Sequence, residues 1–183
     1  MAVRHDKKIA MVHIPKSAGV AIVNNFNMNP KGNHSIYKFY RETYPNYFLF
    51  AVTRNPYDRI ISSYEFMISF DKRYPNKRRY SRMYEQGFEF MCENLKHFGT
   101  LLLRPQTFFV CDNNNNIQVD KILNFENDMW SELYEIFNEV VEPKKYNTTI
   151  RSKTDKYYNK RTKKLVYDYY KEDFDLFNYR EWK

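Results

Sequence analysis

The sequence predicts an α/β fold with a central, mainly parallel sheet flanked by helices. Two short apolar runs, residues 8–12 and 47–53, are typical of buried strands. Each run is followed by a turn and then by a pattern typical of a helix, which begins near Val20 in the first case and near Pro56 in the second. Strands that alternate with helices favour a parallel sheet, in which ligands bind at the carboxyl ends of the strands.

The remaining elements continue this alternation. Strands or strand-like segments are expected at residues 107–111 and 119–125, on either side of a polar turn. The helices that we expect cover residues 20–26, 60–70, 84–97, 128–140 and 154–170. Because the chain has only four glycines and no Ser/Gly-rich linker, its 183 residues are expected to form a single domain, with a flexible tail at residues 1–7.

Basic residues outnumber acidic ones, which indicates an anionic partner. The formal net charge is +8 and the isoelectric point is near 9.3. These values suit a nucleotide, a nucleic acid, a polyanionic sugar or an acidic membrane. The excess is concentrated at residues 72–82 and 151–164, although ordinary solvated surface charge explains it equally well.

The sequence gives no sign of membrane insertion or export. No apolar run is long enough to cross a membrane, and the N-terminus lacks the apolar region of a signal peptide. We therefore expect a soluble, cytoplasmic protein without a membrane span. The two cysteines, Cys92 and Cys111, are expected to be reduced, with a disulfide as the less favoured alternative.

The first candidate site follows the first expected strand, in the segment His-Ile-Pro-Lys-Ser-Ala-Gly at residues 13–19. A strand that turns into a helix aims free backbone N–H groups and the positive end of the helix dipole at one point, and Lys16 adds a full charge. This combination suits a phosphate group. It differs from the G-x-x-x-x-G-K-[ST] pattern because the lysine precedes Ser17 and Gly19. Taken alone, the segment is equally compatible with an ordinary turn and a solvated lysine.

The second candidate site follows the second expected strand, in Arg-Asn-Pro-Tyr-Asp-Arg at residues 54–59. Arg54 offers a planar fork that matches a pair of phosphate oxygens. Ser62 lies two turns into the expected helix, where its hydroxyl could share an anion with Arg54. The alternative is a local ion pair between Arg54 and Asp58. Lys16 and Arg54 both follow the carboxyl end of an expected strand, so we expect them to share one site.

Together, the two segments resemble those of sulfotransferases that use 3′-phosphoadenylyl sulfate (PAPS), and specifically the carbohydrate-type family that includes the heparan and chondroitin enzymes. Residues 103–106, 124–127 and 170–179 also look like segments of this family, so the resemblance extends from about Lys8 to Tyr179. It implies a P-loop-like three-layer fold and a PAPS-dependent transfer to an acceptor hydroxyl, in which adenosine 3′,5′-bisphosphate is the product. It also implies a glycan as the acceptor and no nucleic-acid partner.

The resemblance also implies which residues hold the donor. The 5′-phosphosulfate would lie on residues of the first segment and the helix that follows: Lys16, Ser17, Ala18, Gly19, Val20 and Ala21. The 3′-phosphate would lie on Arg54, Ser62 and, by family position, Arg151. Family members commonly carry threonine or serine directly after the loop glycine, and Val20 and Ala21 depart from that pattern.

Sulfuryl transfer needs positioning, charge stabilisation and removal of the acceptor's proton. Lys16 is placed to stabilise the charge on the leaving oxygen. Histidine is the side chain best suited to act as a base near neutral pH. The family has a histidine at a position like that of His34, between the two segments, and several members use it as the base. His34 is therefore the predicted base, with Glu126 as the runner-up. No cluster of His, Cys and carboxylate residues has metal-ligand spacing, so no metal site is predicted.

Three other functions remain open at this point. A nucleotide-dependent kinase is disfavoured because the chain lacks the Walker lysine pattern. A non-catalytic module that binds a nucleotide or a polyanion would use the basic segments and aromatic residues. A family member that binds the donor without transferring the sulfuryl group is suggested by Val20 and Ala21. The acceptor is also open: the basic segment at residues 72–82 suits an acidic glycan, but a small alcohol, a lipid-linked sugar or a peptide would also fit.

Overall fold

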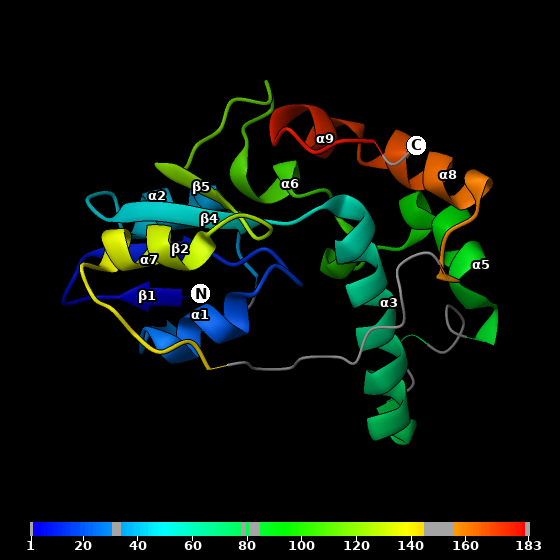
Figure 1. Cartoon of the computed structure of the whole chain (residues 1–183), viewed down its shortest axis with the longest axis horizontal. Helices are drawn as coiled ribbons and strands as arrows, with labels where there is room; N and C mark the ends of the chain where they lie inside the picture. The colour runs from blue at the N-terminus through cyan, green and yellow to red at the C-terminus, as the bar shows by residue number, and fades with distance from the viewer. Residues whose placement is uncertain (1, 31–33, 78–79, 81–84, 145–155, 182–183) are drawn as a thin grey trace. The chain divides into compact units, whose positions relative to one another are not determined.

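The computed structural model describes residues 2–30, 34–77, 80, 85–144 and 156–181. The chain forms two compact units (Figure 1). The first, which we call the sheet unit, comprises Met1–Arg54 and Pro105–Thr148. The second, the helical unit, comprises Asn55–Arg104 and Thr149–Lys183. The two segments predicted to bind the donor follow strands of the sheet unit.

The sheet unit is built on a five-stranded sheet with the order β3-β1-β2-β4-β5. Its strands are β1 (Ala2–Arg4), β2 (Ile9–Val12), β3 (Asn29–Pro30), β4 (Phe48–Thr53) and β5 (Lys121–Asn124). The pairs β2–β4 and β4–β5 are parallel, whereas β1 is antiparallel to both β2 and β3. Four of the five strands therefore point the same way, and the predicted mainly parallel α/β sheet is confirmed.

The register of the central strands aligns the two candidate segments. Ile9 pairs with Phe48, and Val12 pairs with Ala51. Every residue of β2 is buried, as expected for a strand covered on both faces. Because β2 and β4 run in parallel, their carboxyl ends lie at the same edge of the sheet. The chain continues from that edge into residues 13–19 after β2 and into Arg54 after β4.

Helices of the sheet unit pack their apolar residues against the sheet. They are α1 (Gly19–Asn25), α2 (Tyr37–Thr43), α6 (Thr107–Val110) and α7 (Met129–Phe137). The end of α1 meets α7 in the core, where the rings of Phe26 and Phe137 stack with their centroids 4.2 Å apart. Phe50 of β4 packs edge-on against Phe137. This packing holds α1, and therefore the loop before it, against the sheet.

Two expectations for the sheet unit are wrong. Residues 2–4 are not part of a flexible tail, because they form β1 between β2 and β3, with Ala2 fully buried. Residues 107–111 are not a strand: α6 occupies most of this segment, and only Cys111 makes an isolated bridge, to Ile117. A short apolar run is compatible with either a strand or a buried helical turn, so its hydrophobicity could not decide between them.

The helical unit contains the long helix α3 (Pro56–Arg73) and several shorter elements. These are η1 (Pro75–Lys77), α5 (Gly87–Glu93), η2 (Leu95–His97), η3 (Leu101–Leu103), α8 (Lys160–Tyr169) and α9 (Lys171–Leu176). The Asn55 side chain accepts a hydrogen bond from the Tyr57 N–H, and Pro56 occupies the first turn, so α3 begins where the sequence predicts. Within the described residues, no helix combines the length and the apolar character needed to cross a membrane.

Arg59 is a fully buried cation in the helical unit. Its guanidinium donates to the carbonyl oxygens of Leu102, at 3.4 Å, and Arg104, at 2.5 Å. Its Cζ lies 5.4 Å from the ring centroid of Tyr170, whose hydroxyl donates to the Leu103 carbonyl oxygen. Arg59 therefore ties α3 to the chain around η3, and it has a structural role although it belongs to the same motif as Arg54.

Arg59→Met is expected to lower the free energy of unfolding by about 2–3 kcal/mol. The methionine fills part of the volume but removes the guanidinium N–H groups that donate to the carbonyl oxygens of Leu102 and Arg104. Urea unfolding measures the change. The control is Arg73→Met at the exposed end of the same helix, which we expect to change stability by no more than about 0.5 kcal/mol. Equal stability of the two variants would contradict this role for Arg59.

Both cysteines are free thiols in buried positions. Burial raises the pKa of the Cys92 thiol, and nearby Glu89 and Glu93 add to the shift. The thiol therefore stays protonated, and the expected reduced state of the two cysteines agrees with the structure.

Candidate functional site

The loop between β2 and α1 has an uncommon backbone conformation. Lys16 and Ala18 both have positive φ, at 69° and 61°, in the left-handed region. For a residue with a Cβ atom this conformation costs roughly 1–2 kcal/mol, so the surroundings must impose it. When successive residues adopt right-handed and left-handed helical backbone conformations, their N–H groups form a concave array that binds anions. Residues 16–19, which we call the Lys16 loop, therefore have a conformation typical of anion binding.

Arg54 connects the end of β4 to the Lys16 loop. Its side chain is buried, with 3% of the residue exposed. The Nη1 atom donates to the Lys16 carbonyl oxygen at 3.0 Å, and the Cζ atom lies 4.7 Å from the ring centroid of Phe125. The structure therefore brings Lys16 and Arg54 together, as their positions after neighbouring strands led us to expect.

Three buried polar atoms of this region have no hydrogen-bond partner among the described residues. They are the Oγ of Ser17 and the Nε and Nη2 of Arg54. Buried donors are nearly always paired, because an unpaired one costs about 1–3 kcal/mol. A hydroxyl and two guanidinium N–H groups are well suited to the oxygens of a phosphate or sulfate group. The chemistry of these atoms fits an anionic ligand.

Gln106 fixes the backbone of Arg54. Its side chain is fully buried. The Oε1 atom accepts a hydrogen bond from the Arg54 N–H at 2.9 Å, and the Nε2 atom donates to the Arg54 carbonyl oxygen, also at 2.9 Å. The sequence suggests no role for Gln106, although this residue lies in one of the family-like segments. Its partners are main-chain atoms 52 residues away, so no pattern in the sequence could have identified them.

His34 is held by the main chain of the strand that leads into the Lys16 loop. Its Nδ1 atom lies 2.7 Å from the carbonyl oxygen of His13. A carbonyl oxygen can only accept, so Nδ1 carries the hydrogen. In the neutral ring, Nε2 then has a free lone pair and can take up a proton. This tautomer is the one that a general base needs.

The His13 ring connects the Lys16 loop to His34. A Cβ atom at position 19 would overlap the His13 ring, so this position requires glycine. The rings of His13 and His34 meet edge to face, with their centroids 4.5 Å apart. His13 therefore contacts Gly19 with its ring, and it orients His34 with both its ring and its carbonyl oxygen.

Both histidines are neutral at neutral pH. Burial lowers the pKa of His34, and the charge of Lys16 acts in the same direction, while the hydrogen bond to His13 opposes the shift in part. Burial, followed by the proximity of His34 and Lys16, lowers the pKa of His13 to about 3. A neutral imidazole with a free Nε2, close enough to Lys16 to feel its charge, can accept a proton while an anionic group is bound at the Lys16 loop.

A family model described as the sulfotransferase family matches residues 1–180 of the chain. The chain belongs to the sulfotransferase family. The match covers both the sheet unit and the helical unit, and sulfuryl transfer is the reaction of this family. No curated protein and no solved structure gives a significant match to the chain.

The other predicted site residues of this sulfotransferase lie in several places. Val20 and Ala21 lie in the first turn of α1, and Val20 is exposed. Ser62 is a partly exposed residue of α3 in the helical unit, and Arg151 lies outside the described residues. Glu126, the alternative base, is exposed beyond the end of β5. The sheet unit thus brings together the Lys16 loop, Arg54 and His34.

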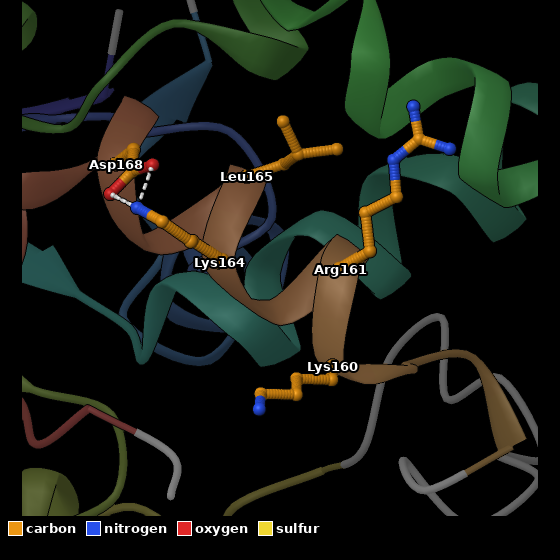
Figure 2. Close-up of a pocket in the computed structure, with 5 residues that line it drawn as sticks. All are labelled: Lys160, Arg161, Lys164, Leu165 and Asp168. Atoms are coloured by element: carbon orange, nitrogen blue, oxygen red, sulfur yellow. Dashed lines mark hydrogen bonds and ion pairs between the residues drawn. The ribbon is translucent and has the colours of Figure 1, made fainter.

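A hollow over α8 in the helical unit does not have the chemistry of an anion site (Figure 2). It is lined by Lys160, Arg161, Lys164, Leu165 and Asp168. The Lys164 Nζ atom forms an ion pair with Asp168 at 2.7 Å, and Arg161 pairs with Glu93 at 2.6 Å. Carboxylates thus neutralise two of the three cations that line this hollow, so the Lys16 loop is the better candidate for an anion site.

The low pKa of His13 predicts a stability that falls in acid. Between pH 6.5 and about 3, an unfolded His13 binds a proton that the folded one does not. The free energy of unfolding therefore decreases as the pH falls below 6.5, by up to about 1.4 kcal/mol per pH unit from this residue. Urea unfolding at pH 7 and pH 5 measures how far the free energy of unfolding decreases between these two values. This decrease should be about 2 kcal/mol smaller in His13→Phe, which keeps a ring against Gly19, than in the wild-type protein. Equal drops in the two proteins would contradict this assignment.

Proposed function

We propose that this sulfotransferase moves a sulfuryl group from PAPS to a hydroxyl of a carbohydrate acceptor, with His34 as the base. The observation that carries the proposal is the set of buried, unpartnered donors on Ser17 and Arg54 beside the Lys16 loop. These donors suit a nucleotide that carries anionic groups at both its 5′ and 3′ ends. A P-loop-like three-layer arrangement around the parallel strands is part of the same proposal.

Each end of the donor has its own set of residues in this proposal. The 5′-phosphosulfate is held by the Lys16 loop, with Ser17 Oγ and the backbone at Gly19, Val20 and Ala21. The 3′-phosphate is held by Arg54, with Ser62 and Arg151 as further contacts. When bound, PAPS supplies a sulfuryl group activated by its bond to phosphate. The Lys16 ammonium stabilises the negative charge that builds on the 5′-phosphate side as this group leaves.

His34 takes the proton from the acceptor hydroxyl. Its Nε2 atom has the free lone pair, because Nδ1–H donates to the His13 carbonyl. The same hydrogen bond remains available when the ring becomes positively charged, so the imidazolium stays oriented. The low pKa of His34 keeps it neutral and ready to act at pH 7. The basic character of residues 72–82 supports an acidic glycan as the acceptor.

Thermal-shift titration tests the donor. Ligands that bind the folded state raise the apparent melting temperature. Adenosine 3′,5′-bisphosphate should raise it clearly more than adenosine 5′-monophosphate at the same concentration, because only the bisphosphate engages Arg54. In Arg54→Ala, the difference between the two nucleotides should disappear. Equal or absent shifts in the wild-type protein would overturn the PAPS assignment.

Gln106→Leu is expected to weaken binding of adenosine 3′,5′-bisphosphate by about tenfold and to affect adenosine 5′-monophosphate much less. The substitution removes both hydrogen bonds that fix the Arg54 backbone. Isothermal titration measures both nucleotides. The control is Gln118→Leu, which removes an amide bonded to Asp112 in the same unit. If both nucleotides weakened equally, Gln106 would only support the fold.

A donor-binding protein without transfer activity is the second candidate. Val20 favours it, since it is 44% exposed and has no hydroxyl where family members commonly carry one. The two candidates differ in one measurement. Incubation with radiolabelled PAPS and a mixture of oligosaccharides gives a labelled acceptor if the protein transfers the group, and only bound nucleotide if it does not.

A further inference from the structure

The Phe125 ring lies against the guanidinium of Arg54. The Cζ atom of Arg54 is over this ring, 4.7 Å from its centroid. Both residues belong to the sheet unit, and each directly follows a strand: Arg54 follows β4, and Phe125 follows β5. These strands are parallel neighbours (Figure 1), and Thr53 pairs with Asn124 in their register. The residues that follow the two strands therefore meet at the carboxyl edge of the sheet.

Hydrogen bonds between the strand ends fix the position of Phe125. Its N–H donates to the Thr53 carbonyl oxygen at 2.8 Å. The Thr53 hydroxyl donates to the side-chain oxygen of Asn124 at 2.9 Å, which ties the ends of β4 and β5 together a second time. The Phe125 ring is partly buried and packs against the apolar core of the sheet unit. Main-chain bonding and core packing therefore hold this ring in place beside Arg54.

The Arg54 guanidinium has one nitrogen in use and one edge open. Its Nη1 atom donates to the Lys16 carbonyl oxygen at 3.0 Å. Its Nε and Nη2 atoms are buried and have no hydrogen-bond partner among the described residues. The N–H groups of Nε and Nη2 point the same way along one edge of the planar group, which is the geometry that binds two oxygens of one phosphate. Because Phe125 covers a face and the carbonyl takes Nη1, this edge is left for a ligand.

The charge of Arg54 forms no ion pair with a carboxylate in the part of the chain that the structure describes. A buried cation is normally paired with a counter-charge. The negative face of an aromatic ring also attracts a cation, and this attraction grows when the cation is shielded from water. Unlike a carboxylate, the ring contacts the face of the guanidinium and leaves the N–H groups of its edge to a phosphate. Phe125 therefore holds Arg54 without competing with an anionic ligand.

We propose that Phe125 is a positioning residue that sets the preference of the site for a nucleotide with a 3′-phosphate. It fixes the plane of the Arg54 guanidinium, so that Nε and Nη2 meet two oxygens of a phosphate at one position of the ribose. The inference rests on the proposed function, which assigns the 3′-phosphate to Arg54. It goes further because it names the residue behind the selectivity and extends that selectivity to the 2′-phosphate isomer, which carries the same charge.

Isothermal titration of the full-length protein with three nucleotides tests this role. The nucleotides are adenosine 3′,5′-bisphosphate, its 2′,5′ isomer and adenosine 5′-monophosphate. Phe125→Leu keeps an apolar side chain but removes the ring, so it should raise the dissociation constant of the 3′,5′-bisphosphate by about tenfold. The constant of the monophosphate should change by less than about twofold, and the preference for the 3′,5′ over the 2′,5′ isomer should fall by about fivefold. Phe125→Tyr keeps the ring and should bind all three like the wild type.

Two controls separate positioning from a general loss of structure. Phe48→Leu removes an exposed ring at the opposite end of β4 and should leave the three dissociation constants unchanged. A double-mutant cycle uses Arg54→Lys as the second background. There, Phe125→Leu should weaken binding of the 3′,5′-bisphosphate by less than about twofold, because lysine has no planar edge to orient. A loss of about tenfold in that background would mean that Phe125 acts without Arg54 and would overturn the proposal.

The remaining outcomes distinguish this inference from the proposed function. If Phe125→Leu weakened all three nucleotides equally, the ring would contact the adenine or only support the fold, and its role in selectivity would be refuted; unchanged binding would refute it as well. If the wild-type protein bound none of the nucleotides, the PAPS assignment would fail. Inorganic phosphate would then decide the role of Phe125. A dissociation constant raised about threefold by Phe125→Leu supports the positioning of Arg54, whereas an unchanged constant, or no binding to the wild type, overturns it.

Discussion

His34→Ala is expected to lower kcat by about 10²–10⁴-fold, the usual effect of removing a general base. The alanine variant has no atom that can take the acceptor's proton from the position of Nε2. It should still bind adenosine 3′,5′-bisphosphate nearly as well as the wild type, because the buried donors of Ser17 and Arg54 are unchanged. Steady-state transfer of a radiolabelled sulfuryl group, combined with calorimetric titration of the product, separates the two effects.

The pH dependence of kcat provides a second test of the same residue. Since burial lowers the pKa of His34, the wild-type rate should stay level from pH 8 to below 6.5 and fall only at more acidic pH, where the base becomes protonated. His34→Ala should lose this acidic limb. The matched control is His97→Ala, which removes an exposed histidine of η2 and should leave kcat and its pH profile unchanged. An unchanged kcat in His34→Ala would rule out His34 as the base.

Local sequence patterns were sufficient to predict the two central strands and the start of α3, which position Lys16 and Arg54. The two central strands are short apolar runs, and each ends at a cation, Lys16 or Arg54, within a few residues. Proline in the first turn of α3 set the start of that helix. These features depend on neighbours in the chain, and parallel pairing then brings the two strand ends to one edge. That is why the proximity of Lys16 and Arg54 could be anticipated before the fold was known.

Interactions with distant main-chain atoms could not be predicted in this way. Gln106 recognises the backbone of Arg54, and His34 recognises the carbonyl of His13. Every residue has a main-chain carbonyl, so the sequence does not indicate which carbonyl a given side chain will bind. Only the register of the sheet and the course of the connecting loops decide which carbonyl is reached.

Arg54 and Arg59 illustrate the same limit within one motif. They are five residues apart and chemically identical, yet Arg54 has two unpaired guanidinium nitrogens beside the Lys16 loop, whereas Arg59 binds the carbonyls of Leu102 and Arg104. The difference arises because Arg59 is already in the first turns of α3, on the side that faces the core. The sequence alone assigned an anion-binding role to the first arginine and could not exclude the same role for the second.

Lys16→Met is expected to lower kcat by about 10²–10³-fold and to weaken binding of adenosine 3′,5′-bisphosphate by about tenfold. Methionine keeps most of the side-chain length but removes the charge that stabilises the leaving group. The larger effect falls on kcat, because the negative charge on the leaving oxygen grows as the bond to sulfur breaks. The rate and binding assays used for His34→Ala measure both quantities.

Lys8→Met is the matched control, because Lys8 also has a positive φ, at 52°, and stands at the opposite end of the same strand. It removes the same charge from the protein, so it corrects for any effect of net charge on the binding of an anionic nucleotide. It should leave kcat unchanged. If both variants lost activity equally, the effect of Lys16 would be long-range electrostatics. If Lys16→Met weakened binding and left kcat unaltered, Lys16 would hold the nucleotide without stabilising the leaving group, and the catalytic role assigned to it would be wrong.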